Sequence, residues 1–185
     1  MQKNREVIWR HRQMTQEEAQ EIAREREGKC FHEVGHLVYG LLHGQVANKV
    51  VISPYPNESG VGWNSTVFQS QEESILEGLA GPATEARYCY LSRIKLITNA
   101  LREHRFPRDN NESMSIDFAR CADLSDDALA DLIESTFTEN YFAENHNLIL
   151  AFARELLKKD YLEAEEIKSI YEKEKNRRAT CSARA

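Results

Sequence analysis

The chain has 185 residues, of which 24 are Lys or Arg and 30 are Asp or Glu, so its formal charge is -6. Hydrophobic residues make up 41% and charged residues 29%, a composition that excludes a disordered chain and predicts one folded domain. The longest wholly apolar runs hold six residues, at 37–42 and 148–153, far fewer than the roughly 20 that span a bilayer. We therefore expect no membrane contact, and the acidic balance argues against nucleic acid as a partner.

The N-terminus carries charges without an apolar segment behind them, so it predicts no secretory signal, and we expect a cytoplasmic location. Residues 123–166 hold twelve acids against three bases, whereas residues 173–185 hold five bases against one acid. The four cysteines form no C-x-x-C pair and predict reduced thiols that pack as small apolar side chains. They are Cys30, Cys89, Cys121 and Cys181.

Two helices are predicted in the first part of the chain. The sequence Thr15-Gln-Glu-Glu18 is a capping box, and we expect the charged helix that it opens to end at Gly28. The second helix is predicted from Lys29 to His43, with Gly44 behind it. Its buried side follows from apolar residues at helical spacing, which are Phe31, Val34, Leu37, Val38, Leu41 and Leu42.

A small β structure is predicted next. Residues rich in β-branched side chains predict strands at 46–53 and 61–68, joined by a loop that contains Pro and Gly, so we expect a hairpin or a small sheet. A second capping box, Ser70-Gln-Glu-Glu73, opens another helix, and Gly81-Pro82 is the point where we expect that helix to break.

The C-terminal half is predicted to be helical. A polar stretch at 95–113 comes first and carries no firm prediction, and a short helix is expected at 114–122. A long helix is then predicted to start at Ser125 and to include Tyr141. Two more helices are expected at 148–159 and 163–174.

One motif indicates chemistry: His32-Glu-Val-Gly-His36 is an H-E-x-x-H sequence on the second predicted helix. Residues four apart share one face of a helix, so both imidazoles can ligate one zinc ion, with Glu33 beside it. In such a site the metal acidifies a water molecule, and Glu33 takes up its proton and passes it to the leaving amine. The motif predicts zinc-dependent peptide hydrolysis. The alternative is an ordinary amphipathic helix with two hydrogen-bonded histidines.

A zinc site of this kind needs a third protein ligand. The metzincin pattern would require Gly at position 39 and His at position 42, but Gly40 and His43 each stand one residue later, so that arrangement is excluded. The residues themselves leave two carboxylates as candidates. These are Glu85, on the helix after Gly81-Pro82, and Asp117, near the start of the helix predicted at 114–122.

Four segments form a set: His32-Glu-Val-Gly-His-Leu-Val38, Lys49-Val-Val-Ile-Ser-Pro54, Leu79-Ala-Gly-Pro-Ala-Thr-Glu85 and Ser115-Ile-Asp-Phe118. Together they resemble the zinc peptidase domain of the FtsH-type ATP-dependent proteases. That family's motifs are His-Glu-Ala-Gly-His, Lys-Val-x-Ile-x-Pro, Leu-x-Gly-x-Ala-Ala-Glu and Ser-Asn-Asp-Leu. The resemblance implies a zincin-like fold in which His32, His36 and Asp117 hold zinc. It leaves Glu85 as a supporting residue of the site.

The chain departs from the family at three motif positions, where Pro82, Thr84 and Ile116 replace Arg, Ala and Asn. It also lacks a G-x-x-x-x-G-K-[ST] loop, so we expect a metalloendopeptidase that works without ATP on flexible or unfolded protein segments. One alternative is a non-catalytic zincin-like regulatory or binding module. Another is a dedicated protease that cleaves one regulatory partner.

These predictions combine into a mostly α fold of the α+β class. The H-E-x-x-H helix and a small hairpin or sheet come first, and the C-terminal half is helical. We expect a charged helical extension at 1–28, a zincin-like peptidase domain at 29–175 and a disordered basic tail at 176–185. The acidic C-terminal helices are a candidate surface for a docking partner or for a second copy of the chain.

Overall fold

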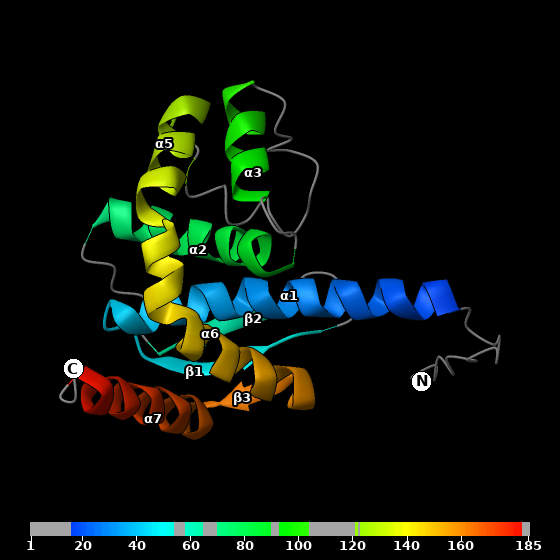
Figure 1. Cartoon of the computed structure of the whole chain (residues 1–185), viewed down its shortest axis with the longest axis vertical. Coiled ribbons are helices and arrows are strands. Elements are labelled where there is room, and N and C mark those ends of the chain that lie inside the picture. The colour runs from blue at the N-terminus through cyan, green and yellow to red at the C-terminus, as the bar shows by residue number, and fades with distance from the viewer. Residues whose placement is uncertain are drawn as a thin grey trace, which may run out of the picture.

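Helices form most of the fold, and a small antiparallel sheet packs against them (Figure 1). The computed structural model describes residues 16–53, 58–64, 70–89, 93–103, 121 and 123–182. The elements in chain order are α1 (Gln16–Leu42), β1 (Ala47–Val51), β2 (Gly60–Trp63), α2 (Gln71–Cys89), α3 (Arg93–Arg102), α5 (Asp126–Thr136), α6 (Glu139–Lys159), β3 (Tyr161–Glu163) and α7 (Ala164–Ser182). The mostly α, α+β fold class is therefore confirmed. Among the described helices, none combines the length and apolar character that crossing a membrane requires.

The sheet has the strand order β2-β1-β3, and both pairings are antiparallel. At its centre Val50 is paired with Val61 on one side and with Leu162 on the other. The strands predicted at 46–53 and 61–68 correspond to β1 and β2, although residues 65–68 lie outside the described part. β3 was not predicted, because three residues are too few to show the alternation of a strand. It pairs with a strand more than a hundred positions earlier in the chain.

Helix α1 is one continuous helix, so the prediction that a first helix ends at Gly28 was wrong. A glycine ends a helix where it adopts a left-handed conformation, and the described glycine with positive φ is Gly44 (φ 80°). The N-terminal half of α1 is also anchored far along the chain. The Arg26 guanidinium donates hydrogen bonds to the Asp160 carboxylate and to the Leu157 carbonyl oxygen.

Helix α2 likewise continues through Gly81-Pro82, where a break was predicted. Proline disfavours the helical conformation of the residue before it by a clash with that residue's Cβ, and glycine has no Cβ. The whole length of α2 therefore stays helical and packs along α1 (Figure 1).

The C-terminal half differs from prediction in its helix boundaries. Helix α3 lies largely within the polar stretch that carried no prediction, and the helix expected at 114–122 falls almost wholly outside the described residues. Ser125 does cap a helix, but α5 ends at Thr136. The chain then restarts as α6, because the Thr138 side chain accepts a hydrogen bond from the Tyr141 backbone N–H.

The predicted disorder of residues 176–185 was wrong for 176–182, because α7 continues to Ser182. Two side-chain contacts stabilise this last part of the helix. Arg177 forms an ion pair with Glu174, and the Arg178 guanidinium donates a hydrogen bond of 3.2 Å to the Asn145 side-chain oxygen on α6.

Three cysteines lie within the described side chains, and all three are free thiols, as predicted. Cys30 and Cys121 are fully buried, and Cys89 is partly buried. Burial raises the pKa of both Cys30 and Cys89 to about 12, so these thiols stay neutral near physiological pH. They pack as small apolar side chains.

Candidate metal centre

The H-E-x-x-H motif lies in the buried C-terminal half of α1. His32 and His36 are one turn apart on one face of the helix, and their ring centroids are 4.9 Å apart. The residues His32, Glu33 and His36 are buried, with exposed fractions of 8%, 8% and 7%. The motif predicted from the sequence is therefore helical, and it brings two imidazoles together in a buried part of α1, where Glu33 is buried as well.

Each imidazole has an oxygen partner at Nδ1, supplied by α2. The His32 Nδ1 lies 3.1 Å from the Glu85 carboxylate, and the His36 Nδ1 lies 2.7 Å from the backbone carbonyl oxygen of Glu77. A carbonyl oxygen can only accept, so the His36 Nδ1 donates to Glu77, and a carboxylate partner favours the same tautomer of His32. A neutral ring with its proton on Nδ1 has its lone pair on Nε2, the nitrogen that a metal would bind.

The two partners reach both histidines because α2 is unbroken and runs antiparallel to α1 at this crossing: His32 meets Glu85, and His36 meets Glu77. Glu77 is buried, and its carboxylate lies 3.5 Å from the His36 Nδ1. Glu77 was not predicted as a site residue. Its hydrogen bond uses a backbone carbonyl, a group that every residue has, so no sequence pattern could have marked it.

Gly81 lies against the ring of His36 at the same crossing. A Cβ atom at this position would stand 2.3 Å from the His36 Nε2, which is too close for any side chain. The absence of a side chain at position 81 therefore leaves room for the imidazole.

We expect Gly81→Ala to lower zinc affinity by roughly 10–100-fold, the range for changes that misorient a histidine ligand. The added methyl group would push away the tip of the His36 ring, and this movement is easier than a shift of backbone. Competition with a chromophoric chelator measures the affinity, and circular dichroism checks that the helices persist. Gly60→Ala is the matched control, since a Cβ at position 60 meets nothing within 4 Å. Unchanged zinc affinity in Gly81→Ala would contradict this account of the contact.

Thr84 lies beside Gly35, at a point where α1 and α2 pack closely. Its side chain is fully buried, and its hydroxyl oxygen has no hydrogen-bond partner among the described residues. A buried hydroxyl without a partner destabilises a fold by about 1–3 kcal/mol.

We expect Thr84→Val to raise the free energy of unfolding by about 1 kcal/mol, because valine has the same shape and no polar atom to bury. Chemical denaturation measures the change. Thr98→Val provides the opposite control, because Thr98 is also fully buried but its hydroxyl donates a hydrogen bond to the Lys95 carbonyl oxygen. That variant should be less stable than the parent. A loss of stability in Thr84→Val equal to that in Thr98→Val would refute the expectation.

The candidate ligand Asp117 lies outside the described residues. His43, which was not expected to be a ligand, lies at the exposed end of α1, where its Nδ1 donates to the Tyr39 carbonyl oxygen and its ring stacks on the Tyr39 ring. Within the described ranges, no three His, Cys, Asp or Glu side chains are arranged to hold a metal ion.

A comparison with profiles of known protein families finds no match to this chain, and a comparison with curated proteins finds none either. What the protein does is therefore inferred from the motif residues and their contacts.

Proposed function

We propose that the protein is a zinc-dependent metallopeptidase that hydrolyses peptide bonds in flexible or unfolded protein segments. The observation that carries the proposal is the pair of oxygen atoms that α2 places beside the Nδ1 atoms of two buried histidines one helical turn apart. Each oxygen can orient its ring, and Nε2 is the atom at which each ring would bind an ion. Zinc-ligating histidines commonly have this arrangement, with a carboxylate or a backbone carbonyl as the partner.

His32 and His36 would hold the ion, and we propose Asp117 as the third protein ligand, from the resemblance to the FtsH-type peptidase domain. The Glu85 carboxylate accepts a hydrogen bond from the His32 Nδ1. We therefore assign Glu85 a positioning role and do not count it among the ligands. Zinc in such a site acts as a Lewis acid that allows water to attack a peptide carbonyl near neutral pH.

Glu33 is the proposed general base. It follows His32 directly on α1 and is buried. Its carboxylate would take the proton from the attacking water and deliver it to the nitrogen of the leaving amine. Glu85 and the Glu77 carbonyl would keep both imidazoles fixed during the reaction, because each holds the Nδ1–H of one ring.

The proposed substrates are segments that can lie in extended form. β2 is an edge strand of the described sheet, and its outer edge could pair with one more strand. A folded substrate would need a separate unfolding step, whereas a flexible segment or an unfolded chain needs none. We therefore propose activity without ATP.

The test is cleavage of fluorescein-labelled casein, a flexible protein, by the full chain. We expect hydrolysis in the absence of ATP, its loss after treatment with phenanthroline, and its return on addition of zinc. Zinc content measured by atomic emission should approach one ion per chain. Proteolysis that survives complete removal of metal would refute the proposal. Failure to bind zinc would refute it as well.

A further inference from the structure

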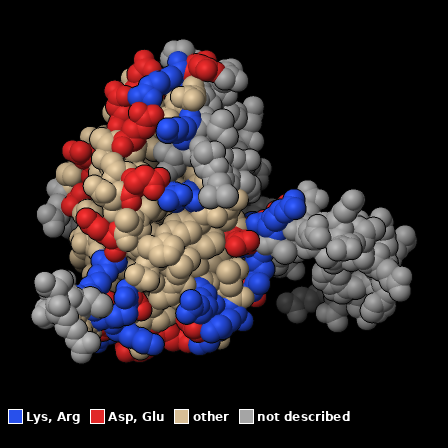
Figure 2. All heavy atoms as spheres, in the orientation of Figure 1, with Lys and Arg blue, Asp and Glu red and all other residues tan. Residues whose placement is uncertain are grey.

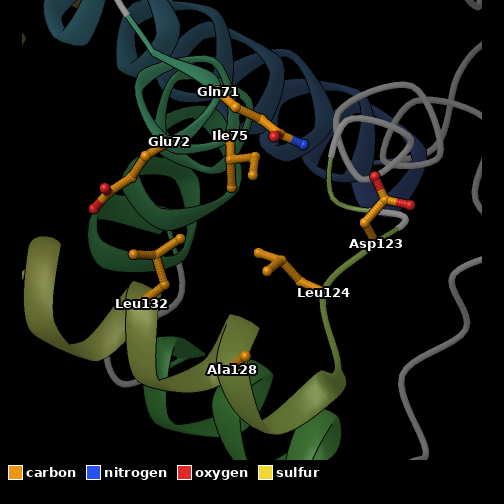
Figure 3. Close-up of a pocket in the computed structure, with 7 residues that line it drawn as sticks. All are labelled: Gln71, Glu72, Ile75, Asp123, Leu124, Ala128 and Leu132. Atoms are coloured by element: carbon orange, nitrogen blue, oxygen red, sulfur yellow. The ribbon is translucent and has the colours of Figure 1, made fainter.

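A groove lies between the first turns of α2 and helix α5, with a cavity volume of about 510 Å³ (Figure 3). Its apolar surface comes from both sides. Ile75 contributes from α2, and Leu124, Ala128 and Leu132 contribute from α5 and the segment before it. The remaining lining residues are polar, and they are Gln71, Glu72 and Asp123.

Two carboxylates flank the apolar side chains. Figure 3 shows Glu72 and Asp123 on opposite sides of the groove. Both are exposed, and neither has an ion-pair partner among the described residues. Further along α5 the negative charge is partly compensated, because Arg102 forms ion pairs with Asp131 at 2.5 Å and with Glu134 at 2.9 Å.

The surface around the groove is also acidic. The first turn of α2 carries Glu72 and Glu73, and the first turn of α5 carries Asp126 and Asp127. Figure 2 shows acidic side chains gathered over the part of the molecule where α5 lies in Figure 1. A basic side chain near the apolar floor would therefore be attracted, and an acidic one would be repelled.

We propose that this groove binds a segment of the protein substrate in which an apolar side chain stands next to Lys or Arg. The apolar side chain would fill the space between Ile75 and Leu132, and the basic side chain would lie near Glu72 or Asp123. The inference rests on the proposed peptidase function, and it assigns that function a substrate class, namely apolar and basic segments.

The position of the groove sets a minimum length for such a segment. Gly81, which contacts the His36 ring, follows Ile75 by six residues and Gln71 by ten on the same helix. A rise of 1.5 Å per residue places the groove about 9–15 Å along α2 from that contact. An extended peptide covers about 3.3 Å per residue. At least about three residues must therefore separate the bound segment from the bond that is cleaved.

The experiment measures binding in the full-length Glu33→Gln variant, so that no peptide is consumed. Three fluorescein-labelled peptides of equal length serve as probes, built from repeats of Leu-Lys-Gly-Ser, Leu-Glu-Gly-Ser or Ser-Lys-Gly-Ser. Fluorescence anisotropy reports the dissociation constants. We expect the Leu-Lys peptide to bind at least about tenfold more tightly than either of the others, because it alone offers both an apolar and a basic side chain.

Substitutions in the groove locate the binding. The double change Glu72→Lys with Asp123→Lys should weaken the Leu-Lys peptide about tenfold or more. Ala128→Trp should do the same by filling the cavity without changing its charge. Asp127→Lys is the matched control, since Asp127 is an exposed acid on α5 that does not line the groove, and its effect should stay below about twofold. Thermal unfolding verifies that every variant is folded.

Equal binding of the three peptides would overturn the proposal, and so would an unchanged dissociation constant in the double variant. An equal loss in Asp127→Lys would also overturn it, because the attraction would then come from the acidic surface in general. These outcomes are independent of cleavage. If the unmodified chain cleaves no substrate while the groove discriminates as expected, only the peptidase function is refuted.

Discussion

Glu33→Gln is expected to reduce peptide hydrolysis by at least about a hundredfold while the chain keeps its fold and its zinc. Glutamine has the shape of glutamate but cannot accept a proton from water, and the loss of a general base costs about 10²–10⁴-fold in rate. The two proposed histidine ligands and their partners Glu85 and Glu77 are unchanged in this variant. Metal content should therefore remain that of the parent.

Initial rates of casein cleavage and zinc content, measured on the same preparations, check this expectation. Glu25→Gln is the matched control, because Glu25 is an exposed glutamate on the same helix, and its rate should equal that of the parent. Activity that persists in Glu33→Gln would rule out the proposed general base. A parent chain that binds zinc but cleaves nothing would favour the alternative of a non-catalytic zincin-like binding module.

Gly35→Ala is expected to lower the stability of the whole domain. A Cβ atom at position 35 would lie 2.3 Å from the backbone carbonyl oxygen of Ala80 and 2.7 Å from the Thr84 hydroxyl oxygen. A backbone atom cannot move aside alone, so α1 and α2 would have to separate along their shared interface. We expect a loss of about 3 kcal/mol in the free energy of unfolding, near the upper end of the usual cost of overpacking.

For a domain of this size that loss corresponds to a decrease of about 6–12 °C in Tm, which calorimetry or circular dichroism can measure. Gly60→Ala again serves as the control and should change Tm little, because its Cβ would enter open space. In Gly81→Ala the added atom meets the tip of the His36 side chain and not a backbone atom. We therefore expect Gly81→Ala to lower Tm less than Gly35→Ala does, and to lower the zinc affinity. An unchanged Tm in Gly35→Ala would show that the two helices are less tightly packed than described.

The local pattern of the sequence was sufficient to predict the motif helix and the central strand. H-E-x-x-H followed by an apolar run predicted a buried helix, and β-branched residues at 50–52 predicted β1. Both predictions depend on periodicity within a few neighbouring residues, which the sequence displays directly. The start of a helix at Ser125 was predicted as well, and the Ser125 side chain caps α5.

Helix ends were less predictable, because tertiary contacts decide whether a breaking residue is tolerated. Gly28 and Gly81-Pro82 were predicted to end helices, but both lie inside continuous ones. Gly81 has no Cβ, and this permits the helix to continue before proline and leaves space for the His36 ring. That space is needed because α1 and α2 pack side by side, a contact that neither local sequence displays.

The sequence by itself determined which residues could bind zinc and move a proton: His32, Glu33 and His36 are recognised by their spacing on one helix. Only the tertiary structure decided how those imidazoles are oriented. Their Nδ1 partners, the Glu85 carboxylate and the Glu77 carbonyl, come from a helix about 40–50 residues further along the chain. The physical reason is that spacing on one helix depends on backbone geometry alone, whereas a hydrogen bond between two helices depends on how the whole chain packs.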